Sequence, residues 1–219
     1  GYLFAGLLLP IFSKLIKEKQ SVLPVSWLSF KLIYFFGLVI CVTVWTYKME
    51  ILNWRYEING SSLMHSSETF GWLMISFIAV SCNYIFGTLL TAKGSMKQLN
   101  ILAVFGILIN ISLNLLLIPD KGSSGAAFAS AFTQFFILIF QVFLCYRIFN
   151  FKYNLIPIIR LFSFTILFIS MVYTVENYLS INWLEKIILN VIGGGIIGLF
   201  LKVINLDQFY SLLKLDKFS

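Results

Sequence analysis

The sequence places two asparagines, Asn110 and Asn114, four residues apart inside a long apolar run. If that run is helical, the two carboxamides lie one turn apart on the same face. A carboxamide donates and accepts hydrogen bonds, so the pair could join neighbouring helices or bind the hydroxyl groups of a sugar. An unpartnered amide in lipid is costly, so we expect this face to meet protein or a wet cavity. Both roles remain open from the residues alone.

Further polar side chains interrupt the apolar runs. With the two asparagines they form the predicted substrate-cavity set: Lys31, Asn83, Thr88, Asn110, Asn114, Gln134 and Gln141. Gln134 and Gln141 are seven residues apart and share a helical face. Lys31 could contact an anionic substrate, but a lysine near a helix end commonly extends its ammonium to the membrane interface instead. Hydrogen bonding between helices is the structural alternative for the amides and hydroxyls.

Groups typical of catalysis or metal binding are sparse. The one histidine, His65, lies in a predicted external loop, and no acidic pair or Ser, His and Asp set falls within an apolar run. The run GGGIIG lacks the Lys of a nucleotide-binding loop, and its Gly194 and Gly198 favour close helix packing. Three dispersed cysteines, without a Cys-x-x-Cys pair, are expected to be small buried residues: Cys41, Cys82 and Cys145. We therefore predict no enzyme activity, no metal and no cofactor.

Composition places the chain in a bilayer. Of its 219 residues 59% are hydrophobic and 11% charged, whereas a soluble domain is about half apolar and about a quarter charged. The long apolar runs do not alternate as barrel strands do, so helices are the spanning elements. The basic residues behind the net charge of +7 are dispersed between these runs, which favours membrane topology over nucleic-acid binding. The predicted fold class is an all-α, polytopic integral membrane bundle.

We predict a truncated first helix followed by about six full spans. The opening GYLFAGLLLPIF is shorter than the roughly 20 residues of a crossing and lacks the basic start of a secretory signal. We therefore expect the C-terminal part of a longer protein. The full spans are predicted at residues 27–47, 71–91, 99–118, 124–146, 156–173 and 184–203. Residues 48–70 form the longest polar break, and the ending INLDQFYSLLKLDKFS has the character of an amphipathic surface segment.

Basic residues are distributed unevenly between the alternate loops that these spans define. One set of loops and tails contains Lys14, Lys17, Lys19, Lys93, Lys97, Arg147, Lys152, Arg160, Lys202, Lys214 and Lys217. The other set contains only Lys48, Arg55, Lys121 and Lys186. Because cytoplasmic loops carry the excess of Lys and Arg, the first set, including the C-terminus, is predicted to be cytoplasmic.

The stretch after Asn114 predicts a tight external hairpin. Pro119 is expected to end one helix, where its missing N–H is harmless, and the Asp-Lys-Gly sequence ending at Gly122 supplies the turn. The next helix opens with Gly125 and a run of small residues that allows close packing. Pro119, Gly122 and Gly125 are the predicted structural residues of this hairpin.

The same stretch carries a resemblance to a known family. NISLNLLLIPDKGSSGAAFASAFTQ resembles a hairpin of bacterial polysaccharide flippases, the Wzx-type O-antigen branch of the MOP/MATE exporter superfamily. Two further segments, LLLPIFSKLIKEK and YIFGTLLTAKGSMKQLN, are similar to the ends of that family's eighth and tenth helices, and the resemblance extends to about Gln141. The hairpin residues that match are Asn110, Asn114, Pro119, Gly122, Gly125, Ala126, Ala127, Ala129 and Gln134.

The resemblance implies a protein about twice as long, in which two helical bundles surround a central cavity and two helices are added. Residues 1–153 would supply most of the second bundle, and residues 154–219 the added pair and a cytoplasmic tail. The implied function is translocation of a polyprenyl-diphosphate-linked oligosaccharide across the bacterial inner membrane, by alternating access, for surface polysaccharide biosynthesis. The implied partners are this lipid-linked substrate, the bilayer and the missing N-terminal bundle, with no nucleic acid.

Other functions remain open. A cation-coupled multidrug exporter of the same superfamily would want a carboxylate within a span, and the sequence places none there. A peptidoglycan-precursor flippase is compatible with everything in this half. A membrane glycosyltransferase or polymerase would need clustered catalytic residues in an external loop, and a non-catalytic scaffold would need none. The predicted loop offers only Arg55, Glu57, His65 and Glu68.

Overall fold

The computed structural model describes residues 2–151 and 155–203, with side chains from residue 5 onward within those ranges. These residues form seven helices and no strand: α1 (Tyr2–Lys17), α2 (Leu23–Thr46), α3 (Lys48–Tyr56), α4 (Gly60–Ala92), α5 (Met96–Phe149), α6 (Leu155–Tyr178) and α7 (Trp183–Phe200). Five of them, namely α2, α4, α5, α6 and α7, are long and apolar enough to cross a membrane. The structure confirms the predicted all-α, polytopic membrane class.

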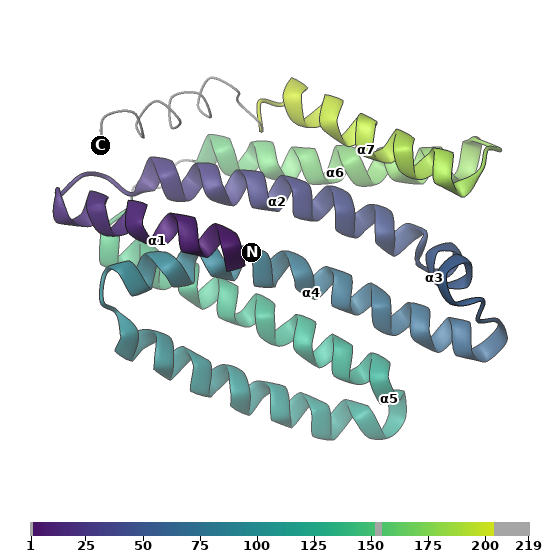
Figure 1. The fold of residues 1–219 in the computed structure, drawn as a ribbon, viewed down its shortest axis with the longest axis horizontal. Helices are drawn as coiled ribbons and strands as arrows, with labels where there is room; N and C mark the ends of the chain where they lie inside the picture. The colour runs from purple at the N-terminus through teal and green to yellow at the C-terminus, as the bar shows by residue number, and fades with distance from the viewer. Residues whose placement is uncertain (1, 152–154, 204–219) are drawn as a thin grey trace.

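Helix α5 is folded back on itself and supplies two crossings. Its backbone leaves helical geometry at Gly122, with φ 56° and ψ −131°, and the two arms run antiparallel (Figure 1). Glycine accepts this conformation because it has no Cβ. The prediction that the first arm ends at Pro119 is wrong, since Pro119 lies inside the helix. A proline so close to the helix end removes one backbone donor without preventing the last turn.

The polar break predicted at residues 48–70 is largely helical, so the prediction that His65 lies in a loop is wrong. Helix α3 fills its first part, and His65 lies in the first turns of α4. With 33 residues, α4 is about 50 Å long, whereas the hydrocarbon core is about 30 Å thick. The polar residues therefore mark a part of the helix that extends beyond the bilayer, which hydropathy alone does not distinguish from a loop.

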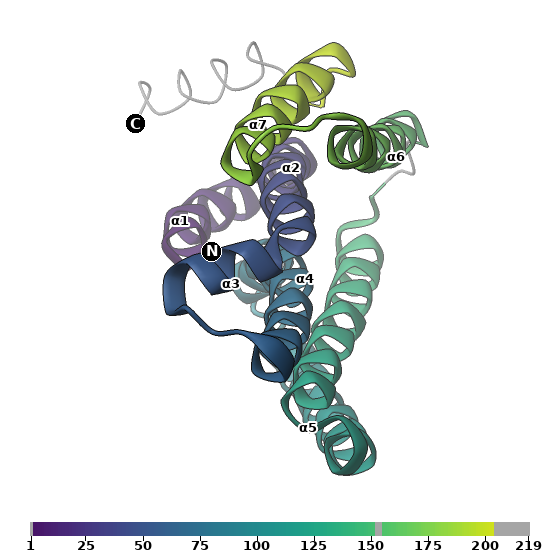
Figure 2. The same cartoon turned by 90° about the vertical axis from the view of Figure 1, so that its right-hand side faces the viewer.

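The long helices pack in layers around α4 and α2. Helix α4 contacts α1, α2, α3 and α5, while α6 and α7 contact each other and α2, so α2 lies between the α6–α7 pair and the rest (Figures 1 and 2). One buried cluster joins α2, α4 and α6 through residues such as Phe35, Ile78 and Phe164. A second joins α1, α2, α4 and α5 through residues such as Phe12 and Leu89. Cys41, Cys82 and Cys145 are buried and free, as expected.

Glycines hold α7 close to its neighbours. A Cβ at Gly194 would lie 2.9 Å from side-chain atoms of Phe168 in α6 and Val39 in α2, and one at Gly198 would overlap the ring of Phe35. The predicted close-packing pair is therefore the contact face of α7. The division at residues 153 and 154 stays a prediction, although α6 begins at Leu155.

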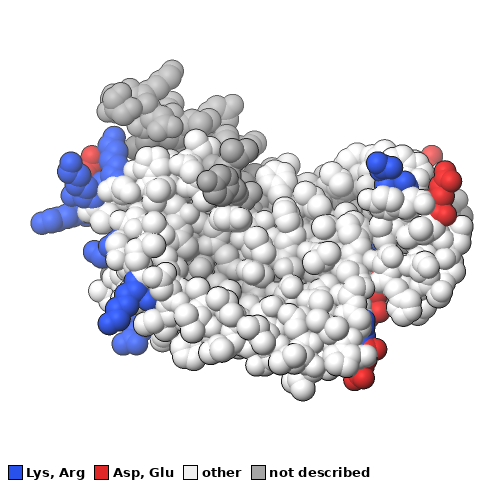
Figure 3. All heavy atoms as spheres, turned by 60° about the horizontal axis from the view of Figure 1, so that its bottom comes forward, with Lys and Arg blue, Asp and Glu red and all other residues white. Residues whose placement is uncertain are grey.

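The two ends of the bundle differ in their charged and aromatic residues. Lys and Arg gather at the end where α1 meets α2 and α4 meets α5, whereas Asp and Glu gather at the opposite end (Figure 3). At the acidic end the Trp45 and Trp72 ring centroids lie 5.5 Å apart, and the ammonium of Lys48 lies 4.1 Å from the Trp45 centroid. Tryptophan is enriched where protein crosses the membrane–water interface, so this contact marks one boundary of the membrane-embedded part.

The chain begins with a short helix that packs against the bundle. Helix α1 has 16 residues, fewer than the roughly 20 of a crossing, and it is not among the five candidate spans. Its Leu8 and Phe12 are buried against the bundle. The predicted amphipathic tail falls in residues 204–219, outside the described residues.

The hairpin contact at Gly125 can be tested by adding one methyl group. A Cβ there would lie 2.6 Å from the Leu117 carbonyl oxygen, so Gly125→Ala is expected to lower the free energy of unfolding by about 1–3 kcal/mol, the usual cost of overpacking. Thermal unfolding of the purified protein in detergent measures the effect. Gly195→Ala is the matched control, because a Cβ at Gly195 meets nothing within 4 Å. Equal stability of the two variants would contradict the close approach of the arms.

Candidate functional site

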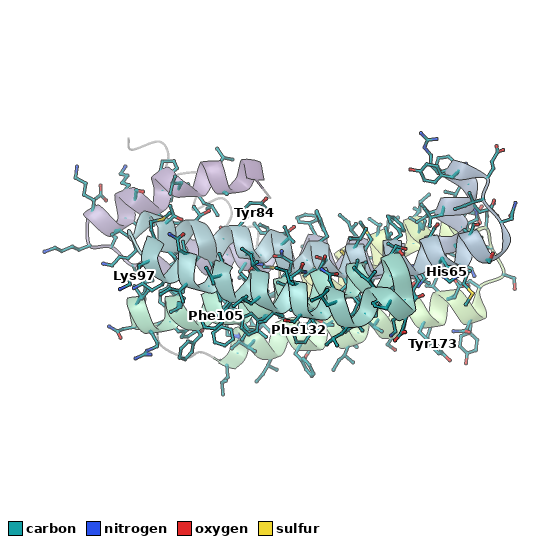
Figure 4. All side chains as sticks on the ribbon, turned by 90° about the horizontal axis from the view of Figure 1, so that it is seen from below. His65, Tyr84, Lys97, Phe105, Phe132 and Tyr173 are labelled. Atoms are coloured by element: carbon teal, nitrogen blue, oxygen red, sulfur yellow. The ribbon has the colours of Figure 1, made fainter. Side chains whose placement is uncertain are left out.

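A line of polar side chains joins α4 to both arms of α5. We call it the amide seam and define it by Asn83, Asn110, Asn114, Thr133, Gln134 and Gln141. Its residues lie inside these helices, eight or more residues from the chain reversal at Gly122. All of them are buried or half-buried, whereas neighbouring residues such as Phe105 and Phe132 are exposed on the surface of α5 (Figure 4).

Asn83 connects α4 to the second arm of α5. Its Nδ2 donates to the Gln134 backbone carbonyl at 3.1 Å and to the Gln134 side-chain Oε1 at 2.9 Å. Both bonds cross between helices far apart in sequence, so they act as the interhelical hydrogen bonds expected of amides in a membrane bundle. The structure thus brings together two of the predicted cavity residues.

The asparagine pair connects the two arms of α5. Asn114 Nδ2 donates to Asn110 Oδ1 at 2.9 Å, one turn away, and Asn110 Nδ2 lies 3.4 Å from the Thr133 hydroxyl oxygen as a long hydrogen bond. Thr133 in turn donates to the Ala129 carbonyl of its own helix at 2.8 Å. The donors of the pair are therefore used in packing, as the structural alternative for these residues requires.

The acceptors of the seam are not used in the same way. Three carboxamide oxygens, Asn83 Oδ1, Asn114 Oδ1 and Gln141 Oε1, are buried and accept no hydrogen bond from the described residues. A buried acceptor without a donor costs about 1–3 kcal/mol. Each of these three oxygens therefore retains the capacity to accept a hydrogen bond.

The Gln141 carboxamide packs against α4 at Gly87. An ideal Cβ at Gly87 would lie 3.5 Å from Gln141 Nε2, so the carboxamide packs over the bare backbone of α4. Gln141 is 8% exposed. The predicted shared face of Gln134 and Gln141 is therefore the face of α5 that meets α4.

Two predicted cavity residues lie apart from these amides. The Thr88 hydroxyl donates to the Tyr84 carbonyl within α4 and is not hydrogen-bonded to the seam. Lys31 is buried in α2, and it lines a cavity with residues of α6 and of the segment that follows α7. The predicted set therefore comprises one connected seam and two separate positions.

An apolar groove runs between α2, α5 and α6, with Phe86 of α4 on its wall. Its volume is about 530 Å³, and aromatic and aliphatic side chains make up nearly all of its lining, among them Phe30, Phe143 and Phe162. Grooves of this composition bind apolar ligands. A lipid chain is the natural occupant of such a groove within a membrane.

A second polar cluster lies at the acidic end, where α2, α6 and α7 meet. The Lys186 ammonium lies 3.2 Å from the Glu176 carboxylate. Tyr47 and Asn190 are fully buried nearby, without a hydrogen bond of regular geometry to the described residues. Burial, together with the Glu176 carboxylate, raises the pKa of the Tyr47 hydroxyl. This cluster joins helices and shows no catalytic grouping.

Among the described residues, no group of three or more His, Cys, Asp or Glu side chains could hold a metal ion. Sequence reasoning missed two of the residues that complete these clusters, Thr133 and Tyr47. Thr133 follows Gly125 at a spacing of eight, which places it on the small-residue face and could have identified it. Asn190 precedes Gly194 by one turn and shares the packed face of α7.

Comparison with known proteins gives the fold. No family model matches the chain, and no curated protein matches its sequence. A solved structure of the lipid II flippase MurJ, in its inward closed conformation, has the same fold with a TM-score of 0.71 and 16% sequence identity. The match covers 92% of this chain and 45% of that chain, so this chain spans less than half the length of MurJ.

The pairing of Asn83 with Gln134 can be measured by a double-mutant cycle. Asn83→Ala and Gln134→Ala are each expected to destabilise the bundle, with a coupling energy of about 0.6 kcal/mol and at most about 1.7, as for other membrane hydrogen bonds. Reversible unfolding in mixed micelles provides the four free energies. The control cycle replaces Gln134→Ala by Ser112→Ala, since Ser112 donates only to Leu108 of its own helix. Additive effects for Asn83 and Gln134 would contradict a direct bond.

Proposed function

We propose that this chain is the C-terminal part of a flippase that moves a lipid-linked oligosaccharide across the bacterial inner membrane. The observation that carries the proposal is the fold shared with the lipid II flippase MurJ over 92% of the chain. The hairpin motif that resembles polysaccharide flippases lies in α5 of that fold and supports the same class independently. Polyprenyl-diphosphate-linked oligosaccharide is the proposed substrate.

The chemistry of the two candidate sites fits such a substrate. The apolar groove suits a polyprenyl chain because its lining is almost entirely hydrocarbon and aromatic. The unpartnered acceptors of the amide seam suit the hydroxyl groups of sugars, which are hydrogen-bond donors. An enzyme would need a nucleophile or an acid–base pair near these surfaces, and the seam offers neutral amides and one hydroxyl.

The remaining partner is a second helical bundle. In the most hydrophobic stretch of α5, only 11% of the residues are buried inside the molecule. On its first arm, Phe105, Leu108 and Leu115 are each more than half exposed. Part of this surface is available to lipid and part to a second bundle. We propose that an N-terminal bundle of the same protein completes the central cavity.

The second candidate function is that of a peptidoglycan-precursor flippase. The observation that favours it is that the matching solved structure is a lipid II flippase, MurJ. The two candidates differ in the headgroup that is moved. Complementation separates them: the complete gene product would restore growth of a strain depleted of its lipid II flippase, or surface polysaccharide in a strain lacking its polysaccharide flippase. Restoration of polysaccharide alone is the expected result. Restoration of growth alone would reassign the substrate to the peptidoglycan precursor. Failure to restore either growth or surface polysaccharide would contradict the flippase proposal in both forms.

The asparagine pair provides the test of the seam. Asn110→Leu combined with Asn114→Leu in the complete protein is expected to reduce export about tenfold, because one or two hydrogen bonds of about 1 kcal/mol each would be lost to the substrate. Polysaccharide at the cell surface and folded protein in the membrane are measured together. Ser112→Leu, on the same arm but outside the seam, should leave export unchanged. Unchanged export in the double variant would assign the pair to packing alone.

We also propose that the basic end of the bundle faces the cytoplasm, which places the C-terminus there. Lys97 and His65 lie at opposite ends of the molecule (Figure 4), and both are exposed. In spheroplasts, a membrane-impermeant maleimide is expected to label a His65→Cys variant directly and a Lys97→Cys variant only after permeabilisation. The native cysteines are buried at 0–1% exposure and should give little background. The reverse labelling pattern would invert the topology.

A further inference from the structure

A pocket at the acidic end of the bundle lies between α3 and the beginnings of α4 and α7, which reach the same end of the molecule (Figure 1). Its volume is about 350 Å³, and it is lined by Met49, Glu50, Asn53, Trp54, Leu63 and Trp183. We call it the indole pocket, because it contains two tryptophans. It shares no lining residue with the apolar groove or with the amide seam.

We propose that the indole pocket binds a sugar ring of a neutral glycan, a choice of ligand that rests on the proposed function. A sugar ring has a face of C–H groups and a rim of hydroxyl groups. The face of an indole is apolar and carries the negative part of the ring quadrupole, which attracts polarised C–H bonds. Carboxylate and amide groups accept hydrogen bonds from hydroxyls. The lining of the pocket supplies both kinds of contact.

Trp54 and Trp183 form the aromatic wall of the pocket. Their ring centroids lie 6.3 Å apart and their planes meet at 58°, so the two rings form an open corner. Trp54 is 69% exposed, and covering so large an apolar ring with a ligand is favourable. Trp183 lies in the first turn of α7, which Asn182 caps by accepting from the Leu184 N–H at 3.1 Å. The wall therefore joins one exposed ring to one ring on a capped helix end.

One face of α3 supplies most of the remaining lining. Met49 and Asn53 are one helical turn apart, and so are Glu50 and Trp54, so these four side chains share a continuous face. The Glu50 carboxylate is exposed and forms no ion pair with the described residues. It is therefore free to accept a hydrogen bond from a hydroxyl group at the rim of a ligand.

The Asn53 carboxamide is held in place by Asn59. Its Nδ2 donates to Asn59 Oδ1 at 3.0 Å. Asn59 is the N-cap of α4, where an asparagine side chain usually accepts from the first turn of the helix, but here it makes no such cap. Its oxygen fixes Asn53 instead. A side chain that is held before the ligand arrives loses less entropy on binding, and a local departure from the usual pattern of this kind is expected at binding sites.

Other ligands fit this lining less well. The Glu50 carboxylate repels a lipid phosphate, and an acyl chain would cover Glu50 and Asn53 without pairing them. A quaternary ammonium ion suits aromatic rings and a carboxylate, but it has neither donor nor acceptor for the Asn53 amide. A neutral sugar matches the rings, the carboxylate and the amide together.

Sugar binding by the purified, intact protein tests the proposal. The protein is placed in nanodiscs, because maltoside and glucoside detergents themselves carry sugars. Saturation-transfer NMR with N,N′-diacetylchitobiose, maltose and lactose identifies the strongest binder, and a titration gives its Kd. At least one of the three is expected to bind with a Kd of about 1 mM, as for a single stacked ring with a few hydrogen bonds. Absence of binding by all three would overturn the proposal.

Variants of α3 assign the binding to the pocket. Trp54→Leu is expected to weaken binding of the same disaccharide about tenfold, because the stacking surface is lost. The matched control is Tyr56→Leu, which removes an aromatic ring of the same helix that is 63% exposed and does not line the pocket. It should change the Kd less than about twofold. Equal losses in the two variants would report general adsorption and would overturn the pocket.

If Trp54→Leu does not fold, Glu50→Gln provides the second measurement. It keeps the shape of the side chain, removes the charge, and is expected to weaken binding several-fold, whereas Glu57→Gln, next to α3 but outside the lining, should not. Unchanged binding by a folded Trp54→Leu or Glu50→Gln variant would overturn the proposal.

Two further arms test the other occupants. Excess choline chloride should leave the disaccharide bound, and complete displacement would make the pocket a cation site and overturn the proposal. Phospholipids brominated on their acyl chains should quench little of the fluorescence of Trp54, measured as the difference between the parent protein and Trp54→Leu. Strong quenching of that difference would show that the indole lies in lipid as an interfacial anchor, and would overturn the proposal as well.

The binding measurement and the complementation experiment fail independently. Absence of sugar binding by a protein that restores growth or surface polysaccharide would overturn the indole pocket and leave the flippase proposal standing. Sugar binding that depends on Trp54, in a protein that complements neither strain, would overturn the flippase proposal and support the pocket.

Discussion

The need to satisfy polar groups inside a membrane governs this structure. Lipid offers no hydrogen bonds, so backbone groups must pair within helices and buried side-chain amides must find partners on neighbouring helices. The amide seam meets this requirement for its donors, because Asn83 and Asn110 both donate across helix interfaces. It does not meet it for three carboxamide oxygens. This surplus of acceptors distinguishes the seam from a packing contact in which every polar atom is paired.

Small residues make the seam geometrically possible. The reversal at Gly122 turns α5 back, and Gly125 lets the two arms approach until backbone contacts backbone. Gly87 leaves space on α4 for the carboxamide of Gln141. A larger side chain at Gly125 would push the two arms apart, so the contact between the arms depends on this glycine.

The α6–α7 pair follows the same packing rule but joins the bundle along one helix. Glycines of α7 contact Phe35 and Val39 of α2, and this attachment leaves an apolar groove on one side of α2 and, near its beginning, a small pocket lined by Lys31, Arg160 and Lys202 among others. The groove and the pocket have opposite chemistries, hydrocarbon and cationic. Both are lined in part by residues of α6.

The class of the protein, its helical crossings and the position of the hairpin can be recognised from the amino-acid sequence alone. Hydropathy and the glycine at residue 122 are properties of a single segment, and a single segment is enough to reveal them. The sequence was wrong where two structures have the same local composition. Polar residues around His65 are compatible with a loop or with a helix that leaves the membrane, and Pro119 is compatible with a helix end or with the turn before it.

Which polar residues meet depends on how helices distant in sequence pack together. The sequence grouped Lys31 with the amides because all of them lie at membrane depth, whereas α2 turns Lys31 toward α6 and the end of α7. It omitted Thr133, which the antiparallel arms bring to Asn110. The physical reason is that periodicity defines the face of a helix on which a residue lies, but the helix that covers that face is chosen by packing among distant segments. Whether an amide oxygen keeps a partner is decided by that choice.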